Sequence, residues 1–212
     1  MYRDGLPGNM RNRAQVLESM LRQIRDSPSL DSCAKAYLFT VFSIQTRLSV
    51  HERCFKEAMG LWPTFASLQD APVSDIAALM QRRGVMFHAV KAKNLKAALE
   101  VLPDFLAEAW PMKDKDARAW VAEHVPGLAF AKSSFFLMLL GRLGCACIDL
   151  HMANLLGVKA SQLRRRGSYE EVEATLGRKP GLKQWLTWMD IKGIPGVGHA
   201  CYFESQGLNP GT

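Results

Sequence analysis

The chain has 212 residues and a formal net charge of +7, because 27 Lys and Arg residues stand against 20 Asp and Glu. Its 48% hydrophobic content can offset the entropy cost of ordering the chain, which excludes a mainly disordered protein. No apolar stretch reaches the roughly 18 uncharged residues that a membrane span needs. Residues 1–13 hold no apolar run typical of a secretory signal. We expect one globular domain over residues 1–212, located in the cytoplasm, and the basic charge favours nucleic acid as partner.

Apolar residues recur at helical spacing along nearly the whole chain, and no segment shows the two-residue alternation of a strand. The predicted fold class is therefore all-α, and the tail from Gly193 is predicted to be irregular. Pro103 is expected to interrupt a helix. In chain order, we expect helices over residues 12–25, from a cap at Ser32 to 42, from a cap at Ser49 to 61, from Ser74 to 83, 89–102, from Asp114 or Asp116 to 124, 130–140, 147–156, 168–176 and 182–189.

The five cysteines show no paired C-x-x-C spacing. The Cys145-Ala146-Cys147 segment is too short to form half of a standard zinc site. We therefore expect reduced structural thiols, with no metal and no cofactor.

The most informative stretch is a Pro-Gly turn that is followed, one predicted helix later, by an acidic residue. Pro126-Gly127 separates two predicted helices, and such a turn presents backbone N–H groups beside a helix N-terminus, which suits a phosphate oxygen. Asp149 then opens the next helix in apolar surroundings. Two roles stay open for Asp149 on these residues alone: a helix N-cap or a catalytic carboxylate.

Four segments occur in the order that a known family shows. Residues 42–46 (Phe-Ser-Ile-Gln-Thr) resemble L-S-x-Q-x-T, and residues 87–95 resemble Y-x-x-K-A-x-x-I/L. Residues 125–129 (Val-Pro-Gly-Leu-Ala) resemble the hairpin L-P-G-V-G, and residues 148–151 (Ile-Asp-Leu-His) resemble V-D-x-H. Together they resemble the helix-hairpin-helix (HhH-GPD) DNA glycosylase superfamily, which includes endonuclease III and the 8-oxoguanine glycosylases.

The resemblance implies a two-lobed helical fold. One lobe would span about 30–125, and the hairpin and catalytic segment would span 125–156. The terminal segments 1–29 and 157–212 would complete the second lobe.

The resemblance also implies a DNA glycosylase that flips a damaged or modified base and hydrolyses its N-glycosidic bond with Asp149. Gln45 would probe the gap left in the base stack. The implied DNA contacts of the hairpin are Pro126, Gly127, Leu128, Ala129, Ala131 and Lys132. The candidates for the base pocket are His51, His88 and His151, with Trp110, Trp120 and Trp188.

Lyase-active members of the superfamily carry a nucleophilic lysine four residues after the first hairpin glycine, and that position is Ala131 here. Lys132 stands one residue later. One residue turns a side chain by about 100° around a helix, so we expect Lys132 to point elsewhere. The resemblance therefore implies a monofunctional enzyme without AP lyase activity, with Lys132 as the alternative nucleophile. The second hairpin glycine is replaced by Ala129, and the C-terminal cysteine cluster of endonuclease III is missing from the sequence.

With these departures, the sequence resembles a lysine-less branch of the superfamily. This branch is associated with hypermodified pyrimidines of bacteriophage and includes the alpha-glutamyl/putrescinyl thymine pyrophosphorylase-like proteins. Three functions stay open: a glycosylase acting on damaged DNA or modified phage DNA, a transferase acting on the 5-substituent of a hypermodified pyrimidine, and a DNA-binding module. The expected partner is DNA with a damaged or modified base, bound by a monomer in a bacterial or phage-infected cell. Residues 194–199 also match the hairpin consensus, and we expect a loop or a second phosphate contact there.

Overall fold

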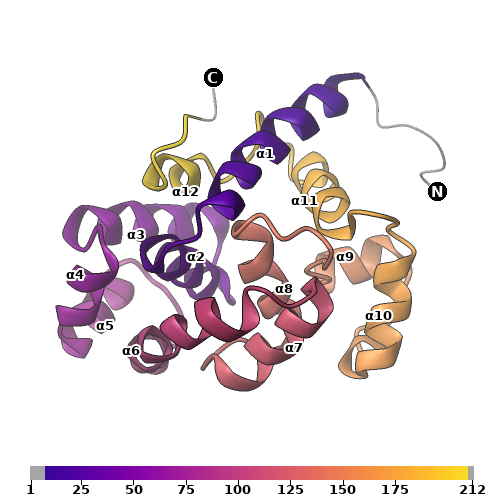
Figure 1. Cartoon of the computed structure of the whole chain (residues 1–212). Helices are drawn as coiled ribbons and strands as arrows, with labels where there is room; N and C mark the ends of the chain where they lie inside the picture. The colour runs from indigo at the N-terminus through magenta and orange to yellow at the C-terminus, as the bar shows by residue number, and fades with distance from the viewer. Residues whose placement is uncertain (1–7, 210–212) are drawn as a thin grey trace.

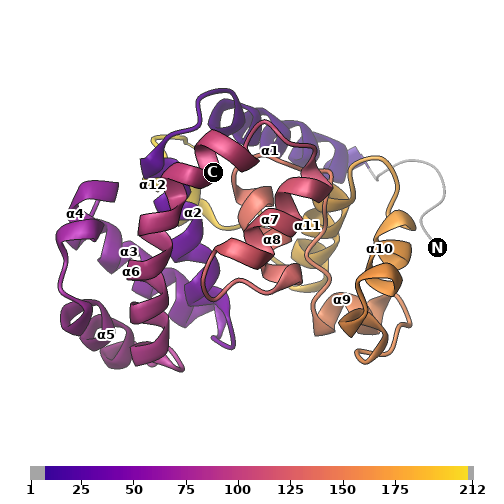
Figure 2. The same ribbon diagram turned by 60° about the horizontal axis from the view of Figure 1, so that its bottom comes forward.

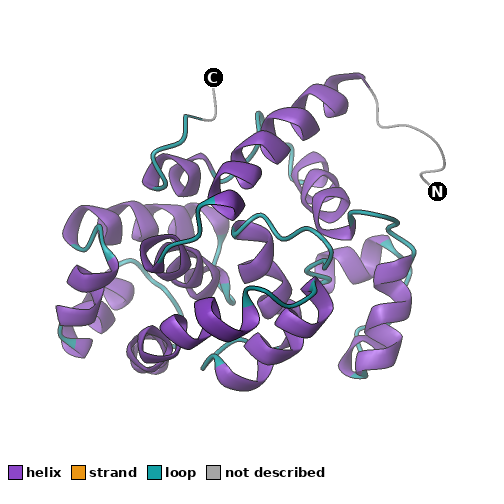
Figure 3. Cartoon of the chain, viewed as in Figure 1, coloured by secondary structure: helices purple, strands orange, loops and turns teal. Residues whose placement is uncertain are grey.

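The computed structural model describes residues 8–209, and this part of the chain is helical and contains no strand (Figure 3). The all-α prediction is therefore confirmed. No helix in the described range is long and apolar enough to cross a membrane. In chain order, the elements are α1 (Gly8–Asp26), α2 (Leu30–Ser43), α3 (Leu48–Leu61), α4 (Phe65–Asp70), α5 (Val73–Arg82), α6 (His88–Asp104), the π-helical turn η1 (Phe105–Ala109), α7 (Asp114–His124), α8 (Phe130–Leu139), α9 (Leu150–Leu155), the 3-10 turn η2 (Gln162–Arg164), α10 (Arg166–Ala174), α11 (Pro180–Ile191) and α12 (Ala200–Ser205).

The helix α2 lies at the centre of the fold and packs against α3, α4, α6, α8 and α12. Most of its residues are buried, as expected of a helix that is apolar on several sides. Figures 1 and 2 show α4 and α5 at one end of the molecule and α9 and α10 at the other. The helices α7 and α8 lie between these ends and pack against each other.

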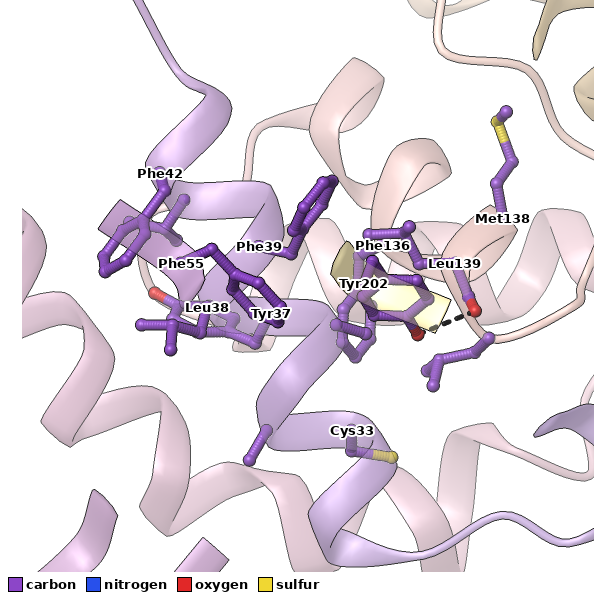
Figure 4. Packing of buried hydrophobic residues seen from close by; sticks show 14 of the residues in the cluster. Cys33, Tyr37, Leu38, Phe39, Phe42, Phe55, Phe136, Met138, Leu139 and Tyr202 are labelled. Carbon is purple, nitrogen blue, oxygen red and sulfur yellow. Dashed lines mark hydrogen bonds between the residues drawn. The ribbon is translucent and has the colours of Figure 1, made fainter. Parts of the chain in front are cut away.

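Aromatic side chains join α2, α3 and α12 in the core (Figure 4). The rings of Phe39 and Phe55 meet edge to face with their centroids 4.9 Å apart. Tyr202 packs against Phe39, and its hydroxyl donates a hydrogen bond to the carbonyl of Leu139 at 2.9 Å. Burying each such side chain stabilises the fold by about 1.5–3 kcal/mol. These contacts attach the C-terminal helix to α8.

Several helices begin earlier than the sequence predicts. Ser29, and not Ser32, caps α2, while Ser32 is the reciprocal partner three residues into the helix. The predicted caps Ser49 and Ser74 are also wrong, because both lie inside the first turn of α3 and α5. The helix predicted from residue 147 begins at Leu150. Two short helices, α4 and α12, were not predicted from the sequence, and α12 lies in the tail that was predicted to be irregular.

Pro103 lies inside α6 instead of interrupting it. Proline has no N–H group to donate, but near the end of a helix this loss affects only the last turn. The chain then continues into η1, where the N–H of Trp110 donates to the carbonyl of Phe105 at 2.8 Å. The expected helix break is therefore a change of helical pitch.

The two ends of the described chain close the molecule from different sides. The helix α1 packs against α11, and α12 packs against α2 and α3. Arg13 of α1 donates hydrogen bonds to the carbonyls of Ile194 at 2.5 Å and Gly196 at 2.6 Å. The loop before α12 is thus fixed to the N-terminal helix.

Candidate active site

Side chains of α2 and α6 lie against the hairpin between α7 and α8. The hydroxyl of Tyr37 donates to the carbonyl of Pro126 at 2.6 Å. Gly127 has φ +80°, and a Cβ atom there would lie 2.8 Å from the amide nitrogen of Asn94. Ala129 occupies the N-cap of α8 and provides no capping side chain. The first N–H groups of α8 thus have no side-chain acceptor at the cap and are available to an anion.

A cavity of about 720 Å³, lined in part by α8, the helix that follows this hairpin, is the candidate active site. It is bounded by the loop that follows α2, by α8, by the start of α9, by α11 and by the loop before α12. Its lining residues are Ser43, Ile44, Gln45, Thr46, Arg47, Leu48, His51, Lys132, Phe135, Met138, Cys147, Asp149, Leu150, His151, Gln184, Trp185, Trp188, Lys192 and His199.

Lys132 lines this cavity, which corrects the expectation that it points elsewhere. Its amine donates to the hydroxyl of Ser43 at 3.3 Å and lies 5.3 Å from the ring centre of Phe135. Ala131 instead packs against the hydrophobic core. The expected register came from counting residues after Gly127. The helix α8 begins at Phe130, as predicted, so the side chain that faces the cavity is set by how α8 packs against α2, α7 and α11.

Asp149 is the N-cap of α9, and its carboxylate accepts a hydrogen bond from the N–H of Met152 at 3.0 Å. The capping role is therefore confirmed. The same side chain lines the cavity with Lys132, so it can also act on a bound molecule. Cys147 lies nearby, but burial raises the pKa of its thiol to about 11, so it stays protonated and weakly nucleophilic.

Gln45 lines the cavity from the exposed loop between α2 and α3. Its φ of +52° lies in the left-handed region, which non-glycine residues rarely occupy. The buried amine of Lys91 donates to the carbonyl of the preceding residue, Ile44, at 2.6 Å and holds the loop in place. Burial lowers the pKa of Lys91 to about 8.

Aromatic and imidazole rings form the wall of the cavity near α11. The imidazole of His199 stacks on Trp188, with ring centres 5.0 Å apart, and its Nδ1 lies 3.4 Å from a carboxylate oxygen of Glu52. The ring of His51 lies 6.0 Å from that of His199. Burial lowers the pKa of both histidines, so both rings are neutral near pH 7. Flat neutral rings of this kind suit a nucleobase.

The structure brings together only some of the predicted base-pocket residues. His51, His151 and Trp188 line the cavity, whereas His88, Trp110 and Trp120 do not. His88 begins α6, Trp110 borders a different pocket, and Trp120 stacks on His124. Four further residues line the cavity and were not predicted from the sequence: Phe135, Gln184, Trp185 and His199. The Pro-Gly-Val-Gly-His motif was the signal for His199, because this loop delivers the histidine to the cavity.

Within residues 8–209, no three His, Cys, Asp or Glu side chains come together in an arrangement that could hold a metal ion. All five cysteines are free and buried, and burial raises the pKa of each thiol to about 11 or 12. The cavity itself is lined by amine, carboxylate, amide and imidazole groups.

The sequence profile of the 8-oxoguanine DNA glycosylases (Ogg-HhH) matches residues 18–179, which include the hairpin, Lys132 and Asp149. The chain belongs to this family. A curated relative, the 8-oxoguanine DNA glycosylase/AP lyase of Sulfolobus acidocaldarius, is 32% identical over 108 residues, or 48% of this chain and 53% of the relative. The match thus spans about half the length of the relative.

Solved structures of this superfamily share the fold. The 8-oxoguanine DNA glycosylase of Thermotoga maritima superposes with a TM-score of 0.68 at 15% identity, covering 87% of this chain and 93% of that one. The Methanocaldococcus jannaschii enzyme gives 0.67 at 18% identity, covering 87% and 86%. A trapped endonuclease III–DNA complex gives 0.54 at 16% identity, covering 86% and 83%. The predicted HhH-GPD fold is therefore confirmed.

Proposed function

We propose that this protein is a DNA glycosylase that removes 8-oxoguanine and then cleaves the strand at the abasic site, with Lys132 as the nucleophile. The observation that carries this proposal is that Lys132 and Asp149 line the same cavity. The proposal replaces the expectation of a monofunctional enzyme, which rested on Lys132 pointing elsewhere. The printed name of the Sulfolobus relative includes AP lyase, which agrees with a lysine nucleophile.

The proposed reaction takes place on a base that has been flipped out of the duplex into the cavity. The amine lone pair of Lys132 attacks C1′ of the deoxyribose, and the bond from C1′ to the base breaks. The base leaves with the bonding electron pair and takes up the proton that Asp149 receives from the attacking amine. The carboxylate of Asp149 stabilises the positive charge that develops on the sugar and accepts the proton that the attacking amine loses.

Strand cleavage would follow from the same adduct. The C1′–O4′ bond breaks, O4′ takes up a proton, and a protonated Schiff base forms between Lys132 and C1′. This cation makes the C2′ proton acidic. Loss of that proton to a base expels the 3′ phosphate, which leaves with the electron pair of the C3′–O bond and so breaks the strand. Water then hydrolyses the Schiff base and releases the amine of Lys132.

The surrounding residues provide the contacts that such a substrate needs. The uncapped start of α8 would bind a backbone phosphate, since Gly127 and Ala129 are exposed there. Gln45 would fill the gap that the flipped base leaves. The flipped base would stack near Trp188 and His199, on the wall of the cavity near α11. The structure of the Methanocaldococcus glycosylase/lyase was solved in complex with DNA containing 8-oxoguanine, which agrees with the substrate proposed here.

The test is mass spectrometry of bases released from defined duplexes, with a borohydride-trapping lane beside it. The panel contains 8-oxoguanine, uracil, alkylated purines, 5-hydroxymethyl pyrimidines and glucosylated phage DNA. We expect release of 8-oxoguanine together with a trapped protein–DNA adduct. Release without an adduct would restore the monofunctional reading. An altered 5-substituent on an intact nucleoside would establish the transferase alternative.

The matched variants are Lys132→Gln and Lys115→Gln. Lys115 is exposed on α7 and does not line the cavity. We expect Lys132→Gln to abolish the trapped adduct and strand cleavage, while Lys115→Gln keeps both. A normal adduct with Lys132→Gln would assign the nucleophile to another amine.

A further inference from the structure

The segment that leads to Asp149, residues 146–148, lies outside the helices. It belongs to the loop between the end of α8 and the start of α9. Ala146 and Ile148 are nevertheless buried. Buried backbone N–H and C=O groups need partners, so side chains from elsewhere must hold this segment.

Tyr169 of α10 supplies two of these partners with one hydroxyl group. The hydroxyl donates to the carbonyl of Ala146 at 2.7 Å and accepts from the N–H of Ile148 at 2.8 Å. Ile148 directly precedes Asp149. Burial raises the pKa of Tyr169, so its hydroxyl stays protonated and keeps its donor role.

Glu173, one turn further along α10, holds the same segment. Its Oε1 accepts from the N–H of Ala146 at 2.7 Å and from the guanidinium of Arg118 at 2.6 Å. Arg118 is fully buried, and its Cζ atom lies 4.0 Å from the ring centre of Phe130. Phe130 is the first residue of α8, the helix that carries Lys132. One buried cluster therefore contacts both the Asp149 segment and the start of the Lys132 helix.

We propose that Tyr169 is a positioning residue that sets the carboxylate of Asp149 relative to Lys132. This inference rests on the proposed function, because it assigns Asp149 and Lys132 to catalysis. Tyr169 does not line the cavity and so acts through the backbone of residues 146–148. Small displacements of a catalytic group reduce rates strongly, by about a hundredfold for about 1 Å.

The test compares Tyr169→Phe with Tyr202→Phe. Both wild-type hydroxyls are buried and donate to a backbone carbonyl, but that of Tyr202 bonds to Leu139 in the core, away from residues 146–149. The readouts are the single-turnover rate of 8-oxoguanine release, the Kd for a duplex with an uncleavable abasic-site analogue, and the melting temperature. We expect Tyr169→Phe to lower the rate by about tenfold to a hundredfold with Kd unchanged. Tyr202→Phe should keep the wild-type rate.

An unchanged rate for Tyr169→Phe would overturn the proposal, as would equal rate losses in both variants. A loss of DNA affinity as large as the loss of rate would also overturn it, because that would indicate a general disturbance of the fold. Wild-type protein that releases no base from any duplex would instead contradict the proposed function.

A measurement on the unmodified protein covers the case in which Tyr169→Phe does not fold. In hydrogen exchange at single-residue resolution, the amides of Ala146 and Ile148 should be protected as strongly as those of the neighbouring helix α8. Exchange as fast as that of the exposed loop before η2 would overturn the proposal. It would mean that the hydrogen bonds from Tyr169 and Glu173 to this segment are open in solution.

Discussion

The carboxylate of Asp149 accepts a hydrogen bond from the backbone N–H of Met152 at 3.0 Å, at the point where α9 begins. One side chain thus fixes the start of a helix and lines the cavity that holds Lys132. The helix orients the carboxylate, so capping and catalysis are compatible roles for the same residue.

Replacing Asp149 separates these two roles. Asn caps a helix about as well as Asp, so Asp149→Asn should leave the free energy of unfolding nearly unchanged. The same variant should slow base release by about 10²-fold to 10⁴-fold, because it loses the negative charge that stabilises the sugar cation. Asp149→Ala should lose the cap as well, at a cost of about 1 kcal/mol in urea unfolding.

The control for this series is Asp190→Asn, since Asp190 is exposed on α11 and does not line the cavity. It should retain the wild-type rate of base release and the wild-type stability. If Asp149→Asn released base at the wild-type rate, the carboxylate would be a cap alone.

Gly127→Ala tests the hairpin. Gly127 has φ +80°, and an added Cβ would lie 2.8 Å from the side-chain nitrogen of Asn94, which would have to move. The left-handed conformation costs a non-glycine residue roughly 1–2 kcal/mol. We expect a loss of stability of about this size and weaker binding of duplex DNA, measured by urea unfolding and by fluorescence anisotropy. Gly167→Ala is the matched control, because Gly167 lies in α10 with open space around it and should tolerate the change.

Most of the helices, the hairpin and Asp149 could be predicted from the sequence. Local patterns determine these features: helical spacing of apolar residues, a Pro-Gly turn, and an acidic residue before an apolar run. The first residues of the helices were harder to predict. Ser29 and Ser32, for example, are both good capping residues, and only the backbone geometry decides between them.

The set of side chains that line the cavity could not be predicted from local patterns in the same way. Lys132 was predicted to face away from a count of residues after Gly127, whereas the side of α8 that faces the cavity depends on how α8 packs against α2, α7 and α11. His199 comes from a loop that Arg13, far away in the sequence, holds by two hydrogen bonds. Such long-range placements follow from tertiary packing and not from local pattern.

The two neutral histidines of the cavity wall predict how stability depends on pH. Burial lowers the pKa of His51 and His199 below the usual value of about 6.5, which both regain on unfolding. Below about pH 6.5 the unfolded chain therefore binds more protons than the folded protein. Stability should fall as the pH is lowered through this range, by at most about 1.4 kcal/mol per pH unit for each histidine, and level off below the folded pKa values.

The variant that checks this dependence is His199→Asn. His199 has φ +49°, and Asn tolerates this left-handed conformation better than most residues, so the loop before α12 should keep its shape. Urea unfolding between about pH 7 and 5 should show a shallower loss of stability for His199→Asn than for the wild type. Equal slopes for His199→Asn and the wild type would mean that His199 binds its proton equally well in the folded and unfolded states.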